Sequence, residues 1–114
     1  MARIVGIHQV ELKPGVTEVE FTAAVRAMSD ADQLEGPNGF VISAAKSDRG
    51  TQVGSYAILF EVESVETRNR WVADDGPTEL FNQYAERHPE FSSAWDHLMS
   101  LVVESYPWND YVIL

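Results

Sequence analysis

The first third of the chain shows two different spacings of apolar residues. Residues 4–12 are mostly apolar and β-branched, and Lys13-Pro14-Gly15 ends the run, which predicts a first strand. Thr17 and Glu20 then have the spacing of a helix-capping box. Apolar residues at helical spacing follow, so we expect a helix from here to about Ala31; they are Phe21, Ala24, Val25 and Met28.

The middle of the chain has the pattern of a β-hairpin. Residues 36–39 (GPNG) are typical of a turn, and residues 40–46 and 55–63 are each strand-like. The Asp48-Arg49-Gly50 segment between these two runs is typical of a hairpin loop. We therefore expect the second and third strands to pair antiparallel.

The last part of the chain is mainly helical. Ser64 is a candidate N-cap for a helix that carries Val65, Trp71 and Val72. Gly76-Pro77 interrupts this helix, and Pro77 suits the first turn of a continuation that ends at His88-Pro89. A further helix is expected to present one apolar face, formed by Phe91, Trp95, Leu98 and Val102. After Pro107, residues 110–114 are expected to form a closing strand.

The predicted order is βαββαβ with an enlarged second helical region. This is the α+β, ferredoxin-like plan, in which helices cover one face of an antiparallel sheet, and we expect residues 1–114 to form one such domain. A chain of 114 residues has no third layer for the other sheet face. We therefore expect a second copy to cover that face in a symmetric homodimer.

Composition and charge exclude several classes of function. The chain has no cysteine, so disulfides, thiolate metal sites and cysteine nucleophiles are excluded. Its formal net charge is −10, which disfavours nucleic acid and anionic membranes as partners. No apolar run is long enough to cross a bilayer, and the N-terminus lacks the layout of a signal peptide. We expect a cytoplasmic protein.

His8 and Tyr56 are the first candidates for chemistry. Strand alternation places His8 on the apolar face of the first strand and Tyr56 on that of the third. If the helices cover both faces, the two side chains share one apolar space and form a candidate acid/base pair. The alternative is structural: a core histidine bonded to backbone or water, and a core tyrosine with its hydroxyl at the rim.

The remaining histidines and tryptophans leave other uses open. His88 suits the C-terminal end of a helix, and His97 suits a surface or boundary position. Histidine spacing typical of helical metal ligands is absent, so no metal is expected. Trp71 follows the third strand and is a candidate roof for the space next to His8.

Two segments resemble a known superfamily. Residues 12–17 (LKPGVT) and 60–67 (FEVESVET), together with the element order, are similar to dimeric α+β barrel proteins. One matching branch is the stress-responsive A/B barrel group, which includes plant polyketide cyclases. The other is the antibiotic-biosynthesis monooxygenase group. The resemblance implies a dimeric α+β barrel.

The resemblance also suggests positions for functional residues. The first-strand catalytic histidine of the cyclases falls nearest Gly6, two residues before His8, their third-strand histidine falls at Tyr56 and their helix tyrosine at Trp71. The monooxygenases often hold an enolate with a helix tryptophan and an asparagine. Trp71 suits the first role, and Asn69 and Asn82 are loose candidates for the second.

The leading hypothesis is an enzyme, without a cofactor, that acts on an aromatic or polyketide-like molecule. His8 would abstract a proton, and Tyr56 with Trp71 would stabilise the enolate, which then reacts with dioxygen or an internal carbonyl. The expected substrate contacts are Gly6, Val10, Ile58, Phe60, Phe21 and His88. The alternatives are a non-catalytic protein that binds a small apolar ligand, and a heme protein with His88 as axial ligand.

Overall fold

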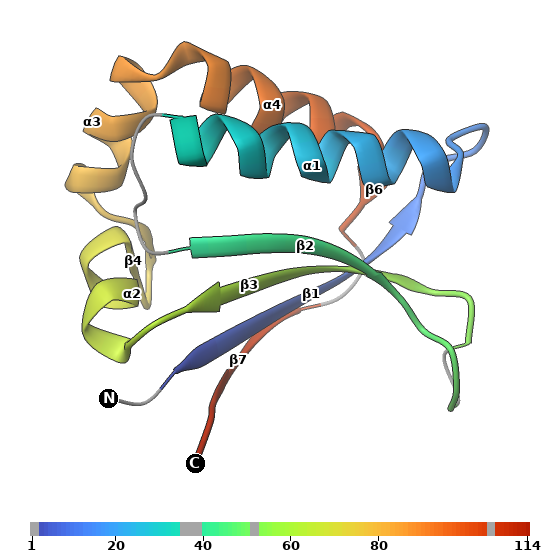
Figure 1. Cartoon of the computed structure of the whole chain (residues 1–114), viewed down its shortest axis with the longest axis horizontal. Helices are drawn as coiled ribbons and strands as arrows, with labels where there is room; N and C mark the ends of the chain where they lie inside the picture. Colours follow the sequence, from blue (N-terminus) through green and yellow to red (C-terminus); the bar gives the residue numbers. More distant parts are fainter. Residues whose placement is uncertain (1–2, 35–39, 51–52, 105–106) are drawn as a thin grey trace.

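The computed structural model describes residues 3–34, 40–50, 53–104 and 107–114, and it has an α+β architecture in which helices cover one face of a sheet (Figure 1). The sheet strands are β1 (Ile4–Leu12), β2 (Phe40–Lys46), β3 (Tyr56–Val62), β6 (Val102–Val103) and β7 (Trp108–Val112). The helices are α1 (Glu18–Leu34), α2 (Val65–Trp71), α3 (Glu79–Arg87) and α4 (Pro89–Ser100). A small hairpin, β4 (Val72–Ala73) and β5 (Gly76–Pro77), separates α2 from α3.

The sheet has the strand order of a ferredoxin-like fold. The order runs β2-β3-β1, and β6 and β7 follow each other along the remaining edge of β1. Every pairing in the sheet is antiparallel, including the predicted hairpin of β2 with β3. The predicted fold class is confirmed, and the enlarged second helical region is α2 to α4 with the β4–β5 hairpin between them.

Local sequence signals account for the helix ends. Thr17 and Glu20 form the expected capping box, in which the Glu20 amide donates to Thr17 Oγ1 (3.1 Å) and the Thr17 amide donates to Glu20 Oε1 (3.3 Å). The Ser64 hydroxyl accepts from the Thr67 amide at the start of α2 (3.1 Å). Pro89 occupies the first turn of α4, where its missing amide hydrogen costs no helical bond.

Several element boundaries differ from the prediction. Helix α1 continues to Leu34 rather than ending near Ala31, and Val72 belongs to β4 rather than to α2. Pro77 is in β5 rather than in the first turn of α3. Helix α3 begins after Thr78, the N-cap, whose hydroxyl accepts from the Phe81 amide. Strand β7 begins at Trp108, two residues before the expected start. The predicted turn at 36–39 lies outside the described residues.

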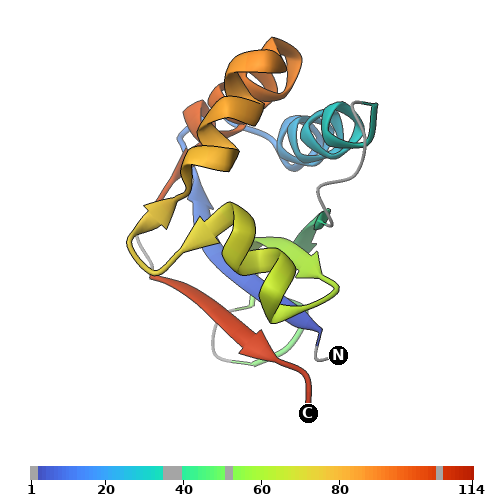
Figure 2. The same cartoon turned by 90° about the vertical axis from the view of Figure 1, so that its left-hand side faces the viewer.

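The core fills the space between the sheet and the helices. Strand residues of even number face α1 and α4, which lie over the same side of the sheet in both views (Figures 1 and 2). Ile4, Val10 and Ile58 on this face are at most 1% exposed, as are Phe21 and Leu98 from the helices. This face is the apolar one that strand alternation predicted.

The opposite sheet face has no cover within the described chain. It presents Ile7 and Leu59, which are register partners and half-buried, together with the more exposed Val41 and Tyr111. Apolar side chains that share one sheet face are typical of a protein interface. The uncovered face is consistent with the predicted homodimer, which remains a prediction.

We predict that a charge on this face separates the dimer. The wild-type chain should have twice the chain mass of 12.8 kDa by light scattering after size exclusion, and Leu59→Lys should have the single-chain mass. Val19→Lys is the control, because Val19 is exposed on α1. A monomeric wild type, or a Leu59→Lys protein that stays dimeric, would contradict the prediction.

Candidate functional site

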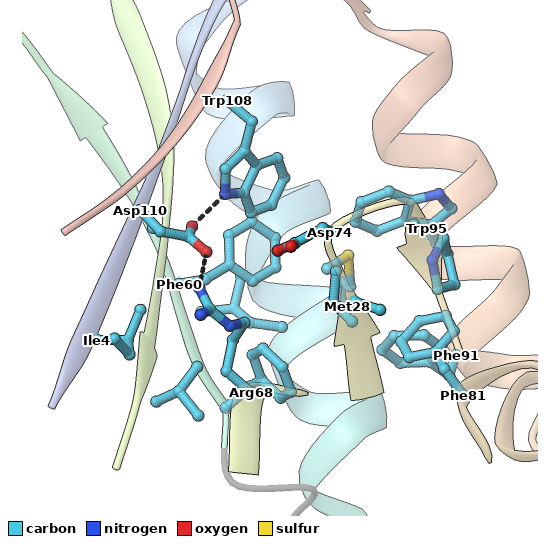
Figure 3. A pocket seen from close by; sticks show the side chains of 18 residues that line it. Ile4, Met28, Phe60, Arg68, Asp74, Phe81, Phe91, Trp95, Trp108 and Asp110 are labelled. Carbon is cyan, nitrogen blue, oxygen red and sulfur yellow. Dashed lines mark hydrogen bonds and ion pairs between the residues drawn. The ribbon is translucent and has the colours of Figure 1, made fainter. Parts of the chain in front are cut away.

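A cavity of about 650 Å³ opens between the sheet, the helices and the β4–β5 hairpin (Figure 3). The described residues that line it are mostly apolar, and six carry aromatic rings: Phe40, Phe60, Phe81, Phe91, Trp95 and Trp108. Three lining residues are charged: Arg68, Asp74 and Asp110. A concave, aromatic site of this size with a few polar groups is typical of small-molecule binding.

The cavity walls come from elements that are distant in sequence. Phe60 on β3 forms part of the sheet wall and contacts Trp108 of β7, with 4.7 Å between ring centroids. Phe81 of α3 and Phe91 of α4 contact each other edge to face at 5.9 Å on the opposite side (Figure 3). Aromatic walls favour an apolar or aromatic ligand.

A chain of hydrogen bonds crosses the sheet side of the cavity. The Trp108 indole donates from Nε1 to Asp110 Oδ1 (2.7 Å), and Arg68 Nη1 donates to Asp110 Oδ2 (2.5 Å) (Figure 3). The side chains of Arg68 and Asp110 are 22% and 31% exposed, so water screens their attraction less than at an open surface. This pair connects α2 to the edge strand β7.

Gly6 makes room for this arrangement. Gly6 pairs with Asp110 across the β1–β7 ladder and with Phe60 across the β1–β3 ladder. A Cβ atom at position 6 would lie 2.8 Å from Asp110 Oδ1 and 3.0 Å from Trp108 Nε1. Any side chain at this position therefore displaces the indole or the carboxylate.

His8 lies beside the cavity but does not line it. It is 6% exposed and sits next to Trp108, with 4.8 Å between ring centroids. Its Nδ1 atom has no hydrogen-bond partner among the described residues. Burial lowers the pKa of His8 from its ordinary value of 6.5, and the nearby Glu104 carboxylate opposes part of this effect. The imidazole is therefore uncharged near neutral pH.

Tyr56 shares the sheet face of His8, but its hydroxyl is used elsewhere. The hydroxyl donates to Glu18 Oε1 (3.2 Å), and Lys46 Nζ lies 3.0 Å from the same oxygen. The hydrogen bond from Lys46, followed by that from Tyr56, lowers the pKa of Glu18, and Glu18 in turn raises the pKa of Lys46. The Tyr56 ring contacts Phe21 edge to face, and its hydroxyl points to this exposed cluster.

Trp71 and His88 lie together away from the cavity. Both contact Tyr84, at centroid distances of 5.6 Å and 4.3 Å, and His88 Nδ1 is 3.9 Å from Glu90 Oε1. Among the predicted ligand contacts, Gly6 and Phe60 line the cavity, whereas Val10, Ile58 and Phe21 belong to the core.

The structure brings together three charged residues that sequence reasoning missed. Arg68 is on α2, Asp74 follows β4, and Asp110 is on β7. The spacing of Trp108 and Asp110 was the available signal, because residues two apart on a strand lie on the same face and the carboxylate can then lie beside the indole.

The described residues form neither a metal site nor a membrane-spanning helix. Within the described residues, no group of three or more His, Asp or Glu side chains has the arrangement of a metal site. Among the same residues, no helix combines the length and hydropathy needed to cross a bilayer.

The fold is that of ferredoxin-like proteins, as the resemblance to dimeric α+β barrel proteins implied. No protein-family model and no curated protein matches the sequence. Solved structures do match, with identities that establish the fold alone. One is a dimeric protein of unknown function and ferredoxin-like fold from Bacteroides fragilis, with a TM-score of 0.51, 18% identity, and coverage of 97% of this chain and 96% of that chain.

Two further matches have names that describe an activity. A candidate antibiotic biosynthesis monooxygenase from Bordetella bronchiseptica has a TM-score of 0.57 and 17% identity, over 100% of this chain and 97% of that one. SnoaB, a cofactor-independent oxygenase from Streptomyces nogalater, has a TM-score of 0.52 and 11% identity, over 98% and 91% of the chains. Monooxygenase-type proteins are thus among the structural neighbours.

We predict that Gly6→Ala destabilises the chain by about 1–3 kcal/mol, because the new methyl group overlaps Asp110 and the Trp108 indole. Urea unfolding of Gly6→Ala, Asp110→Ala and the double variant measures this effect. The cost of Gly6→Ala should be smaller in the Asp110→Ala background, where the nearest clashing atom is gone. An equal cost in both backgrounds would contradict the steric explanation.

We also predict a contribution of His8 to the pH dependence of stability. Because the folded pKa is lowered from 6.5, the unfolded chain takes up this proton first on acidification. The contribution is complete above about pH 6.5 and is lost as the pH falls through the folded pKa.

Unfolding free energies of wild type and His8→Gln, measured from neutral to acidic pH, test this prediction. The wild type should lose up to about 1.4 kcal/mol per pH unit more than the variant in that window. His88 and His97 are present in both proteins and cancel. Parallel pH profiles would refute the predicted pKa direction.

Proposed function

We propose that this protein is an enzyme that needs no cofactor and acts on an aromatic or polyketide-like small molecule through an enolate. The observation that carries the proposal is the cavity, which combines aromatic walls with a charged pair, Arg68 and Asp110, held at its edge. The fold shared with a cofactor-independent oxygenase supports the same class of reaction. We further propose that the active form is the homodimer.

In this proposal, His8 is the proton acceptor. A buried, uncharged imidazole whose Nδ1 lacks a partner among the described residues has a free lone pair or N–H for a reacting group. The Trp108 ring contacts His8 and lines the cavity, whereas His8 does not line it, so the proposed mechanism requires this ring to turn aside before a ligand reaches the imidazole. Trp108 is 42% exposed on an edge strand, where the core does not enclose its side chain fully.

Arg68 is the proposed oxyanion partner. Its Nη1 donates to Asp110 and its Nε donates to Asn69 (2.8 Å), which fixes the guanidinium plane at the cavity wall. The remaining nitrogen, Nη2, has no hydrogen bond to another described residue, and we propose that it donates to the enolate oxygen. Arg68 takes the role that the sequence suggested for Tyr56 and Trp71, whose side chains contact Glu18 and Tyr84 instead.

The chemistry that follows depends on the electrophile that meets the enolate. With dioxygen, a ring CH₂ group is converted to a carbonyl, and one O₂ is consumed for each water released. With an internal carbonyl, the same enolate closes a ring by aldol addition. In this proposal the substrate decides between the two reactions.

Oxygen uptake with an anthrone, such as dithranol, tests the proposal, because this tricyclic ketone has an acidic CH₂ group. The wild-type protein should accelerate uptake above the spontaneous rate, and His8→Gln should lower the enzymatic rate by about 10²–10⁴-fold. The control is His97→Gln, at an exposed position on α4. A His8→Gln protein that is folded and retains the wild-type rate would remove His8 from the mechanism.

The position of Trp108 also favours a second candidate function, the binding of a small aromatic molecule without turnover. With the indole in its observed place, His8 does not line the cavity, whose aromatic walls and polar edge suffice for binding. Ligand binding without oxygen uptake or cyclisation would favour this function.

A further inference from the structure

The β4–β5 hairpin forms one wall of the cavity and carries an acidic residue at its turn. Asp74 and Asp75 connect Ala73 to Gly76, and the positive φ of Gly76 (124°) suits the tight turn. Asp74 lines the cavity, whereas Asp75 is not among the described lining residues. In the view of Figure 3 the Asp74 carboxylate is drawn between Phe60 and Trp95, among the side chains that line the cavity.

Hydrogen bonds at its base hold the hairpin in place. The Thr78 amide donates to the Trp71 carbonyl (3.0 Å), and the Thr78 hydroxyl donates to the Arg70 carbonyl (2.7 Å). Thr78 is also the N-cap of α3, so the hairpin is anchored to both flanking helices. The Asp74 carboxylate is therefore carried by a short, tethered turn rather than by a long loop.

The charges around the cavity do not cancel. The lining residues comprise one cation and two carboxylates, which leaves one negative charge on a chain whose net charge is −10. Arg68 is engaged by Asp110, and Asp74 has no ion pair or hydrogen bond with any other described residue. Asp74 is an exposed residue, so water partly screens its charge, but an unpaired carboxylate that lines a concave site still repels an anion that enters the site.

We propose that Asp74 determines which ligands the cavity accepts, a proposal that rests on the proposed function in using the same cavity. Asp74 accepts a hydrogen bond from a hydroxyl or ammonium group of an aromatic ligand, and its charge excludes aromatic carboxylates and phosphates. Asp110 contributes less to this selection, because both of its oxygens already accept hydrogen bonds from Arg68 and Trp108.

A matched series of naphthalenes tests the proposal by calorimetry, without any requirement for turnover. Near neutral pH, 2-naphthol is a neutral donor, 2-methoxynaphthalene lacks the donor, and 2-naphthoate is an anion. The wild type should bind 2-naphthol more tightly than 2-methoxynaphthalene. Its affinity for 2-naphthol should exceed that for 2-naphthoate by a factor of about ten or more. Asp74→Asn should reduce the gap between naphthol and naphthoate by about tenfold, mainly through tighter binding of naphthoate.

Asp75→Asn is the matched control, because it removes the same charge from the adjacent turn position outside the cavity lining. It should leave the ratio of naphthol to naphthoate affinities within about twofold of wild type. An equal effect of the two substitutions, an unchanged ratio in Asp74→Asn, or a wild type that prefers naphthoate would overturn the proposal. Failure to bind any naphthalene would overturn it together with the proposed function. If the predicted selectivity is found but the protein does not accelerate oxygen uptake, the proposal for Asp74 is supported and only the proposed catalytic activity is contradicted.

Discussion

The ion pair between Arg68 and Asp110 connects the edge of the sheet to the second helical region. Strand β7 is exposed along its length. Besides this ion pair, the backbone ladder with β1 holds β7 to the rest of the fold. Asp110 accepts from Arg68 on one oxygen and from the Trp108 indole on the other, so one carboxylate fixes both α2 and the indole. A half-buried carboxylate with both oxygens satisfied avoids the cost of an unpaired buried charge. The arrangement requires a glycine at position 6, because a side chain there would occupy the space of the Asp110 carboxylate and the Trp108 indole.

The position of the Trp108 ring follows from this pair and decides the geometry of the site. The ring lines the cavity and contacts both Phe60, which also lines it, and His8, which does not. Among the described residues that line the cavity, Trp108 is thus one that also contacts the buried imidazole. His8 is thus buried next to a ligand-sized space, and in the proposed mechanism a ligand reaches it only when Trp108 moves.

Sequence patterns predicted the parts of the fold that depend on local chemistry. Alternation identified the covered face of β1 and β3, and the Thr17 and Ser64 caps began their helices where expected. The site was harder to predict because it depends on register. Leu12 of β1 pairs with Val102 of β6, and His8, four residues earlier on β1, pairs with Trp108 of β7, six residues after Val102. The register of the last strands against β1 therefore shifts by two residues between β6 and β7. No local signal specifies that shift, which places Asp110 over Gly6. Likewise, Trp71 packs on Tyr84 rather than over His8. This contact depends on the position of α3 relative to α2, which the β4–β5 hairpin between the two helices determines.

The most direct test of this account uses the three tryptophans as reporters of ligand position. Trp95 and Trp108 line the cavity, and Trp71 packs on Tyr84 outside the set of lining residues. In a ¹H–¹⁵N correlation spectrum assigned with single Trp→Phe variants, saturating 2-naphthol should shift the indole N–H signals of Trp95 and Trp108 and leave that of Trp71 nearly unchanged. A shift confined to Trp71, or no indole shift although the ligand binds, would show that the cavity between the sheet and the helices is not the ligand site.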